Sequence, residues 1–351
     1  MIKVLIADDS AMMRKLLKRI LEADGELEVV ASARDGIDVV EKAREYHPDV
    51  VTMDVNMPGL DGISALQYIV NEQICPVVMV SSLTQEGAVT TFEALELGAF
   101  DFVGKPGGTV SSNLDSVAPE LIAKVKAAAR LKGNRRGIQM LTRAKQEPSR
   151  SAVTTRARST KTLKAVAMGI STGGPKVIYE VLPILPPDIN AVLFLVQHMP
   201  PNFTTTYVNR LNSACKLEVV EAQAGMKVQP GTLYVGSGGK HLYLVKNSAG
   251  EVMIRLTSKP DHLFIPSVGV MMESVLEVYQ KKTIGVIMTG MGNDGADAMV
   301  KIRQAGGITI AESEESAIVW GMPGDTVKKG GAEIVAPIWD IAKEIMKAVN
   351  K

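Results

Sequence analysis

Val4-Leu5-Ile6-Ala7-Asp8-Asp9 decides the fold of the first part of the chain, because four apolar residues run directly into two acids. A short apolar run of this kind is typical of a strand buried on both faces of a parallel sheet. Segments with helical apolar spacing separate it from four further runs, at residues 29–31, 50–53, 77–80 and 100–103. Five alternations of strand and helix predict a doubly wound α/β fold around a parallel sheet.

Polar side chains stand at the ends of these predicted strands, where ligands bind in doubly wound sheets. Asp8 and Asp9 end the first strand, Asp54 the third and Ser81 the fourth, and Lys105 follows the fifth. Clustered carboxylates repel one another unless a hard cation such as Mg²⁺ shares their oxygens, and a lysine can neutralise phosphoryl oxygens. The pattern predicts a phosphoryl-acceptor pocket, although the acidic pair alone could equally be a solvated strand end.

Residues 1–129 resemble a two-component receiver domain. The segments that carry the resemblance are Ala7-Asp8-Asp9-Ser10, Met53-Asp54-Val55-Asn56-Met57-Pro58-Gly59, Val80-Ser81-Ser82 and Gly104-Lys105-Pro106. The resemblance implies that a chemotaxis histidine kinase phosphorylates Asp54. It also implies that Mg²⁺ is held by Asp8, Asp9, Asp54 and Asn56, and that Ser81, Phe102 and Lys105 respond to the phosphoryl group. Asn56 stands where an acidic residue is expected in this subfamily.

The formal net charge of +1 conceals three segments of different charge. Residues 1–129 hold 11 Lys/Arg against 20 Asp/Glu, residues 130–164 hold 11 against 1, and residues 165–351 hold 17 against 17. The middle segment has little periodic apolar content and a run rich in Ser and Thr, which predicts a basic flexible linker. A nucleic-acid-binding arm is the alternative. No nucleic-acid partner is expected, because the part from Ala165 onward has alternating strands and helices rather than a helix-turn-helix.

A second set of polar residues follows the strands predicted in residues 165–351. The run 165–170 ends at Ser171 on a Gly-rich turn, the run 192–196 is followed by His198, and the run 284–289 is followed by Asp294. Parallel strands share an edge at their carboxyl ends, so these residues could act as nucleophile, base and orienting acid. Taken singly, they could also be a phosphate-binding turn, a structural histidine and a helix cap.

Residues 165–351 resemble the catalytic domain of chemotaxis protein-glutamate methylesterases, which are response regulators, so the two resemblances cover nearly the whole chain. The carrying segments are Gly169-Ile170-Ser171-Thr172-Gly173-Gly174-Pro175, Gln197-His198-Met199-Pro200 and Met288-Thr289-Gly290-Met291-Gly292-Asn293-Asp294-Gly295-Ala296. In two further segments Gly269 replaces an expected acidic residue and Asp325 replaces a small one.

The resemblance implies a Ser171-His198-Asp294 hydrolase that removes methyl esters from glutamate side chains of chemoreceptors, with release of methanol, and often deamidates receptor glutamines. The N–H groups of Met291 and Thr172 are the candidate oxyanion donors, and no cofactor is expected for the esterase.

Both sites on one chain imply regulation: we expect the unphosphorylated receiver to cover the Ser171 cleft and phosphorylation of Asp54 to weaken this docking. A non-catalytic response regulator, acting as a phosphate sink or receptor adaptor, is the alternative function.

The cysteines and the apolar runs of the sequence bear on where the protein is found. Cys75 and Cys215 lie far apart in the sequence, which favours reduced thiols over a disulfide framework. The N-terminal apolar run is too short and too acidic for a signal peptide, and no apolar run approaches the roughly 20 residues that span a bilayer. We therefore expect a cytoplasmic protein without membrane insertion.

Overall fold

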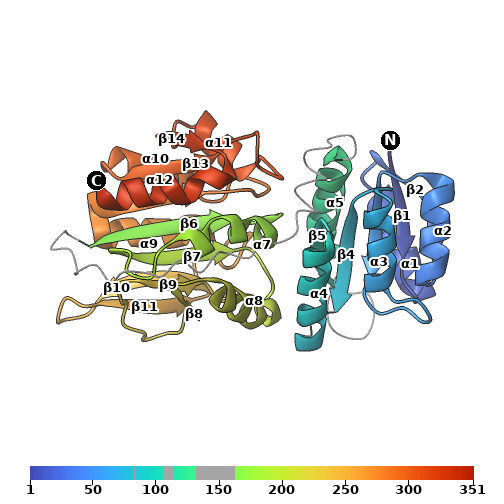
Figure 1. The fold of residues 1–351 in the computed structure, drawn as a ribbon, viewed down its shortest axis with the longest axis horizontal. Helices are drawn as coiled ribbons and strands as arrows, with labels where there is room; N and C mark the ends of the chain where they lie inside the picture. Colours follow the sequence, from blue (N-terminus) through green and yellow to red (C-terminus); the bar gives the residue numbers. More distant parts are fainter. Residues whose placement is uncertain (83, 106–113, 132–162) are drawn as a thin grey trace. The chain divides into compact units, whose positions relative to one another are not determined.

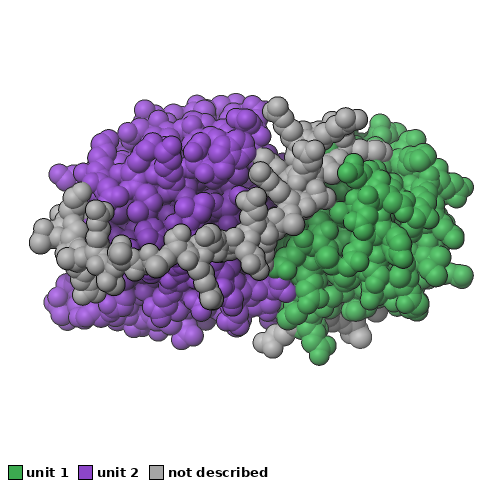
Figure 2. Space-filling model, in the orientation of Figure 1, with its two compact units in different colours: residues 1–145 green, residues 146–351 purple. Residues whose placement is uncertain are grey.

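The chain forms two compact units, Met1–Lys145 and Gln146–Lys351 (Figure 2). The structure is a computed structural model, and it describes residues 1–82, 84–105, 114–131 and 163–351. Nearly all of the predicted linker, 130–164, therefore lies outside the described residues. Of its ends, residues 130 and 131 close the last helix of the first unit, and Lys164 begins the first strand of the second.

The first unit has a five-stranded parallel sheet in the order β2-β1-β3-β4-β5 (Figure 1). Its strands are β1 (Ile2–Ala7), β2 (Leu27–Ala33), β3 (Val50–Asp54), β4 (Val77–Ser82) and β5 (Asp101–Lys105). Its helices are α1 (Ala11–Glu22), α2 (Gly36–Tyr46), α3 (Gly62–Asn71), α4 (Gln85–Leu97) and α5 (Leu114–Leu131). Helix α1 packs with α5, whereas α2, α3 and α4 pack in a row. The doubly wound fold predicted for this part is confirmed.

Helices of this unit start where short polar side chains cap them. Ser10, Asp35, Asp61 and Thr84 each accept a hydrogen bond from a backbone N–H in the first turn of α1, α2, α3 and α4, respectively. Such caps satisfy amides that have no partner within the helix. Because each cap lies in the loop after a strand, the chain turns back over the sheet there and leaves the polar strand ends together at one edge.

The second unit has a seven-stranded sheet in the order β14-β13-β12-β6-β7-β9-β8, with every pair parallel. Its strands are β6 (Lys164–Ile170), β7 (Ala191–Gln197), β8 (Glu218–Glu221), β9 (Thr232–Val235), β12 (Thr283–Ile287), β13 (Ile308–Glu312) and β14 (Ile334–Ala336). Its helices are α7 (Gly174–Val177), α8 (Pro201–Ala214), α9 (Val268–Tyr279), α10 (Ala296–Gln304), α11 (Met322–Lys328) and α12 (Ile338–Asn350). The unit also contains three short 3-10 helices: η1 (Ile178–Glu180), η2 (Leu182–Ile184) and η3 (Gln280–Lys282).

The strand order of this sheet reverses at β6. The chain goes from β6 to β7 on one side and later returns to place β12 on the other. Such a reversal opens a crevice at the carboxyl ends of the strands, where ligands bind in open α/β sheets. The parallel-sheet α/β domain predicted here is confirmed, and its central strands are those that precede the predicted site residues.

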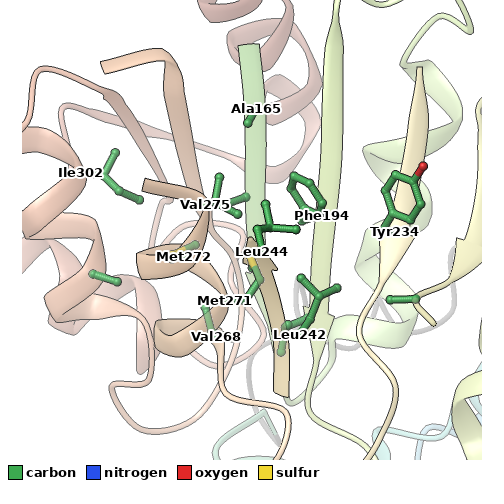
Figure 3. Close-up of a cluster of buried hydrophobic side chains, with 14 of the residues drawn as sticks. Ala165, Phe194, Tyr234, Leu242, Leu244, Val268, Met271, Met272, Val275 and Ile302 are labelled. Carbon is green, nitrogen blue, oxygen red and sulfur yellow. The ribbon is translucent and has the colours of Figure 1, made fainter. Parts of the chain in front are cut away.

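A two-stranded antiparallel hairpin, β10 (His241–Lys246) and β11 (Val252–Thr257), was not predicted. Helix α9 contacts both β10 and β6, and its apolar side chains form a buried cluster with those of the strands (Figure 3). Phe194 and Tyr234 stack in this cluster with ring centroids 5.9 Å apart. The cluster fixes the position of α9, whose first turn reaches the site described below.

No helix among the described residues has both the length and the apolar character needed to cross a bilayer. Cys75 and Cys215, both among the residues described, form no disulfide.

Candidate active site and phosphoacceptor pocket

The acidic residues predicted for the first unit do meet at one edge of its sheet. One carboxylate oxygen from each of Asp8, Asp9 and Asp54 lies within 4.8 Å of the others. Asp8 and Asp54 are buried, whereas Asp9 is exposed. Lys105 closes the group, with its Nζ 2.8 Å from Asp8 Oδ2 and 2.7 Å from Asp54 Oδ2.

The pocket holds three carboxyl groups and one lysine ammonium, so negative charge is in excess. Burial raises the pKa of Asp54, and the hydrogen bonds from Lys105 and from the Asn56 N–H offset that effect only in part. Burial opposes a charge on Lys105, but its bonds to Asp54 and Asp8 raise the pKa of the ammonium. Carboxylates plus an open exposed side are what Mg²⁺ requires, since it keeps several waters and uses one or two carboxylates. The residues present therefore fit this metal.

Arg14 also supports the acidic pocket, and it was not predicted from the sequence. Its Nη1 donates to the backbone carbonyls of Asp8 and Asp9, at 2.7 and 2.9 Å, and the Ser10 N–H donates to Asp8 Oδ1 at 2.9 Å. These bonds fix the turn between β1 and α1, and so fix the direction of the two carboxylates. An arginine one turn into the helix after an Asp-Asp pair was the only available signal.

Ser81 and Phe102 are buried, and both contact α4. The Ser81 Oγ donates to the Gly87 carbonyl at 3.3 Å, and Phe102 packs edge-to-face against Phe92 with ring centroids 6.3 Å apart. Lys124 lies over the Phe102 ring, with its Nζ 5.2 Å from the centroid. Phe102 is thus a packed core side chain in this structure, and its role as a moving reporter stays a prediction.

In the second unit, Ser171, His198 and Asp294 form a continuous hydrogen-bonded series. The Ser171 Oγ lies 3.0 Å from His198 Nδ1, and His198 Nε2 lies 2.9 Å from Asp294 Oδ2. Ser171 follows β6, His198 follows β7, and Asp294 lies in the loop between β12 and α10. The nucleophile, base and acid expected from their order in the sequence are therefore brought together.

Asp294 receives four hydrogen bonds, three of them from the start of α9. Ser267 Oγ donates at 2.8 Å, the Val268 N–H at 2.7 Å and the Gly269 N–H at 2.9 Å, in addition to His198. Burial opposes ionisation, but the bonds from His198 and from the Gly269 and Val268 amides outweigh it and lower the pKa of Asp294 to about 2. The ionised carboxylate accepts from Nε2–H, which leaves Nδ1 free to accept the Ser171 proton.

The two departures from the family pattern have different structural settings. Gly269 contributes a backbone N–H to Asp294, and a Cβ at this position would lie 3.2 Å from Asp294 Oδ1. Asp325 lies in the first turn of α11, where its N–H donates to the Gly321 carbonyl at 2.9 Å. Gly269 therefore supports Asp294 without a side chain.

Gly290 lies too close to Ser171 to carry a larger side chain. A Cβ on Gly290 would lie 2.3 Å from Met322 Sδ and 2.8 Å from Ser171 Cβ, so the chain passes directly beside the nucleophile one residue before Met291. No hydrogen bond from the N–H of Thr172 or Met291 is found within the described part of the chain. Both candidate oxyanion donors are thus available, and their role stays a prediction.

Gln197 and Phe264 also contact the site and were not singled out from the sequence. Gln197 Nε2 donates to the carbonyls of Ser171 and His198, at 2.9 and 3.1 Å, and so ties the two turns together. Phe264 stacks on the His198 ring with centroids 4.3 Å apart and planes at 9°. The position of Gln197 next to His198 was a usable signal, whereas nothing local marked Phe264.

Each of the two units matches a known protein family. Residues 166–345 match the family model for CheB methylesterase, and residues 4–111 match that for the response regulator receiver domain. The protein-glutamate methylesterase/protein-glutamine glutaminase 3 of Syntrophomonas wolfei is 72% identical over 100% of both chains. That of Caldanaerobacter subterraneus subsp. tengcongensis is 50% identical over 100% of this chain and 97% of the relative.

A solved structure agrees with these matches. The catalytic domain of Thermotoga maritima CheB methylesterase is 37% identical, and the similarity covers 53% of this chain and 99% of that one with a TM-score of 0.52. Because family models and full-length relatives agree, the chain belongs to the CheB methylesterase family, with a response regulator receiver domain ahead of the catalytic domain.

Proposed function

We propose that this chain is a phosphorylation-regulated protein-glutamate methylesterase that also deamidates glutamine side chains. Its substrates are methylated glutamates and glutamines of chemoreceptors, and methanol or ammonia is released. The observation that carries the proposal is the hydrogen-bonded series Ser171-His198-Asp294 at the carboxyl edge of the sheet, in a chain whose relatives bear this activity in their names. This series favours an enzyme over a phosphate sink or receptor adaptor.

Ester hydrolysis follows from the roles that the geometry allows. Ser171 Oγ attacks the ester carbonyl while His198 Nδ1 takes its proton, and Asp294 stabilises the imidazolium. The N–H groups of Thr172 and Met291 receive the oxyanion. The imidazolium then gives its proton to the departing methoxide, so methanol leaves and an acyl-enzyme remains. Water, deprotonated by His198, releases the glutamate carboxylate and restores Ser171.

The receiver pocket supplies the proposed control. A histidine kinase or a small phosphodonor transfers its phosphoryl group to Asp54, and Lys105 neutralises part of the new charge. Asp8, Asp9, Asp54 and the Asn56 carbonyl would hold Mg²⁺, which when bound neutralises the phosphoryl oxygens. Phosphorylation relieves the inhibition that the receiver exerts on the esterase. A cytoplasmic location is part of the proposal, because the proposed substrates are the cytoplasmic helices of chemoreceptors.

Asp54→Asn is expected to remove the response to phosphodonor while leaving basal activity in place. In the unchanged chain, acetyl phosphate with Mg²⁺ should raise methanol release from methylated receptor membranes by about 5- to 150-fold, the usual range of coupling between two sites. Asparagine cannot form the acyl phosphate, so the variant should show no rise, and chelation of Mg²⁺ should abolish the rise in the unchanged chain.

Asp61→Asn is the matched control for this experiment. Asp61 is an exposed acid of the same unit that caps α3, and asparagine caps helices equally well. This variant should respond to phosphodonor as fully as the unchanged chain. Stimulation of Asp54→Asn to the same extent would exclude Asp54 as the phosphoryl acceptor.

A further inference from the structure

Glu312 is a fully buried carboxyl group that the proposed mechanism does not use. It is the last residue of β13 and is 0% exposed. Its Oε2 accepts from the Thr289 N–H at 2.7 Å, and its Oε1 accepts from Ser316 Oγ at 2.8 Å. None of the ion pairs found among the described residues includes it. Burial raises its pKa to about 7 in spite of these two bonds. A buried carboxyl without a cation is costly, so an apolar residue would pack here more cheaply.

The other polar groups of Thr289 form hydrogen bonds with Ser171, Thr172 and Val319. Its carbonyl accepts from the Ser171 N–H at 3.0 Å, and its hydroxyl donates to the Thr172 carbonyl at 3.0 Å. The same hydroxyl accepts from the Val319 N–H at 2.9 Å. The Thr289 N–H is the remaining polar group, and Glu312 is its acceptor.

The two residues after Thr289 form the wall beside the nucleophile. Gly290 approaches Ser171 so closely that an added Cβ would lie 2.8 Å from Ser171 Cβ, and Met291 is a candidate oxyanion donor. The path of this segment therefore sets the distance between the Ser171 side chain and the group that would receive the oxyanion. A displacement of about 1 Å in such a site can cost a hundredfold in rate.

Glu312 is itself held firmly on its other side. Ser316 Oγ, which donates to Glu312, also accepts from the Ile338 N–H at 2.9 Å at the start of α12. Trp320 Nε1 donates to the Glu312 carbonyl at 3.1 Å. The Glu312 carboxyl group thus links β13 and, through Ser316, the start of α12 to Thr289, which precedes the segment beside Ser171.

We propose that Glu312 is a positioning residue of the esterase site: by accepting the Thr289 N–H, it fixes the segment that places Ser171, Thr172 and Met291 relative to one another. The proposal rests on the proposed function, because it assigns a role within that reaction. Glu312 does not touch the substrate; it acts through Thr289. A purely structural role would instead affect folding stability and leave the geometry at Ser171 unchanged.

Three variants of the full-length chain test this assignment. Glu312→Leu has a similar volume and no acceptor, Glu312→Gln keeps a carbonyl acceptor at the same reach, and Glu312→Asp keeps the charge but withdraws the acceptor by one methylene. Thr283→Val is the matched control, because Thr283 is equally buried at the opposite end of β12 and its hydroxyl has no partner in the described structure. Each variant is measured for thermal unfolding, rate of Ser171 labelling by a fluorophosphonate, and kcat and KM for methanol release.

Glu312→Leu should lower both the labelling rate and kcat by about 10- to 100-fold with an unchanged KM. Glu312→Gln should stay near the unchanged chain, and Glu312→Asp should be slower than Glu312→Gln. Thr283→Val should keep both rates and unfold no more easily than the unchanged chain, because it removes a buried hydroxyl that has no partner in the described structure. If Glu312→Leu does not fold, the Gln and Asp variants carry the comparison.

Several results would overturn the proposal. They are a folded Glu312→Leu variant with unchanged rates, equal rates for the Gln and Asp variants, or a Thr283→Val variant whose labelling rate falls as far as that of Glu312→Leu. If the unchanged chain is labelled at Ser171 but releases no methanol, the proposed substrate is wrong. The labelling rates would still decide the role of Glu312.

Discussion

Ser171→Ala is expected to lower methanol release from methylated receptor membranes by about six orders of magnitude, the loss seen when the serine of a comparable triad is removed. Ser171 Oγ is the atom placed 3.0 Å from His198 Nδ1, and alanine offers no atom that could attack the ester. The fold should survive, because the hydrogen bonds that hold this turn use the backbone N–H and carbonyl of residue 171. Methanol release per mole of folded protein is the measurement.

Ser213→Ala provides the control for this loss. Ser213 is an exposed serine of α8 in the same unit, and its hydroxyl donates to the Asn209 carbonyl at 2.9 Å. The control should retain full activity and full labelling by a fluorophosphonate, and Ser171→Ala should lose both. Retained methanol release in Ser171→Ala would remove Ser171 from the role of nucleophile.

Asp294→Asn is expected to lower kcat by about 10⁴-fold. Each carboxylate oxygen of Asp294 accepts two hydrogen bonds, so an amide NH₂ group in either orientation would face a donor. Asparagine that donates to Nε2 would also force the proton of the ring onto Nδ1, where it blocks transfer from Ser171. The measurement is kcat, with Asp297→Asn as the control, since Asp297 is an exposed acid three residues along that pairs with Lys329.

The same substitution should also reveal a pH-dependent contribution to stability. The pKa of Asp294 is about 2 in the folded chain and about 3.9 when unfolded, so the ionised group contributes about 2–3 kcal/mol at pH values above the unfolded pKa. That contribution is lost as the pH falls through the folded value. The free energy of unfolding in urea should therefore differ most between the two proteins at neutral pH, and the gap should narrow between about pH 4 and pH 2. A gap independent of pH would show that the ionised carboxylate is not the source.

The strands of the first unit and the three that precede Ser171, His198 and Asp294 could be predicted, because parallel strands buried on both faces are marked by continuous apolar runs. Strands β8, β9, β13 and β14 were not identified individually. The ends of the predicted strands were less predictable. The run 284–289 was expected to be strand throughout, but β12 ends at Ile287 because Thr289 leaves the ladder to bond Thr172 and Val319. The β10–β11 hairpin was missed, although Asn247 and Gly250 form a hydrogen-bonded turn between the two strands.

The three residues of the proposed triad could be found from the sequence because each follows a strand of one parallel sheet. Their supports could not be found in this way. Val268 and Gly269 bind Asp294 through backbone amides, which carry no signature of residue type, and they lie 26 and 25 residues away. Glu312 acts through the amide of Thr289, 23 residues distant. Long-range contacts made by the backbone depend on packing of α9 and β13, which apolar periodicity does not specify.

The orientation of the His198 ring bears on how such sites are recognised. In the serine proteases Nε2 faces the nucleophile and Nδ1 faces the acid, whereas here Nδ1 faces Ser171 and Nε2 faces Asp294. The two ring nitrogens of His198 have exchanged roles relative to those proteases. The proton still passes from the serine to the histidine, but it is accepted by Nδ1 rather than Nε2. A search template that matches named atoms would pass over this chain, while one that matches donor and acceptor positions would find it. The geometry of the proton relay is thus the same in both kinds of site, and the ring atoms that carry the proton are exchanged.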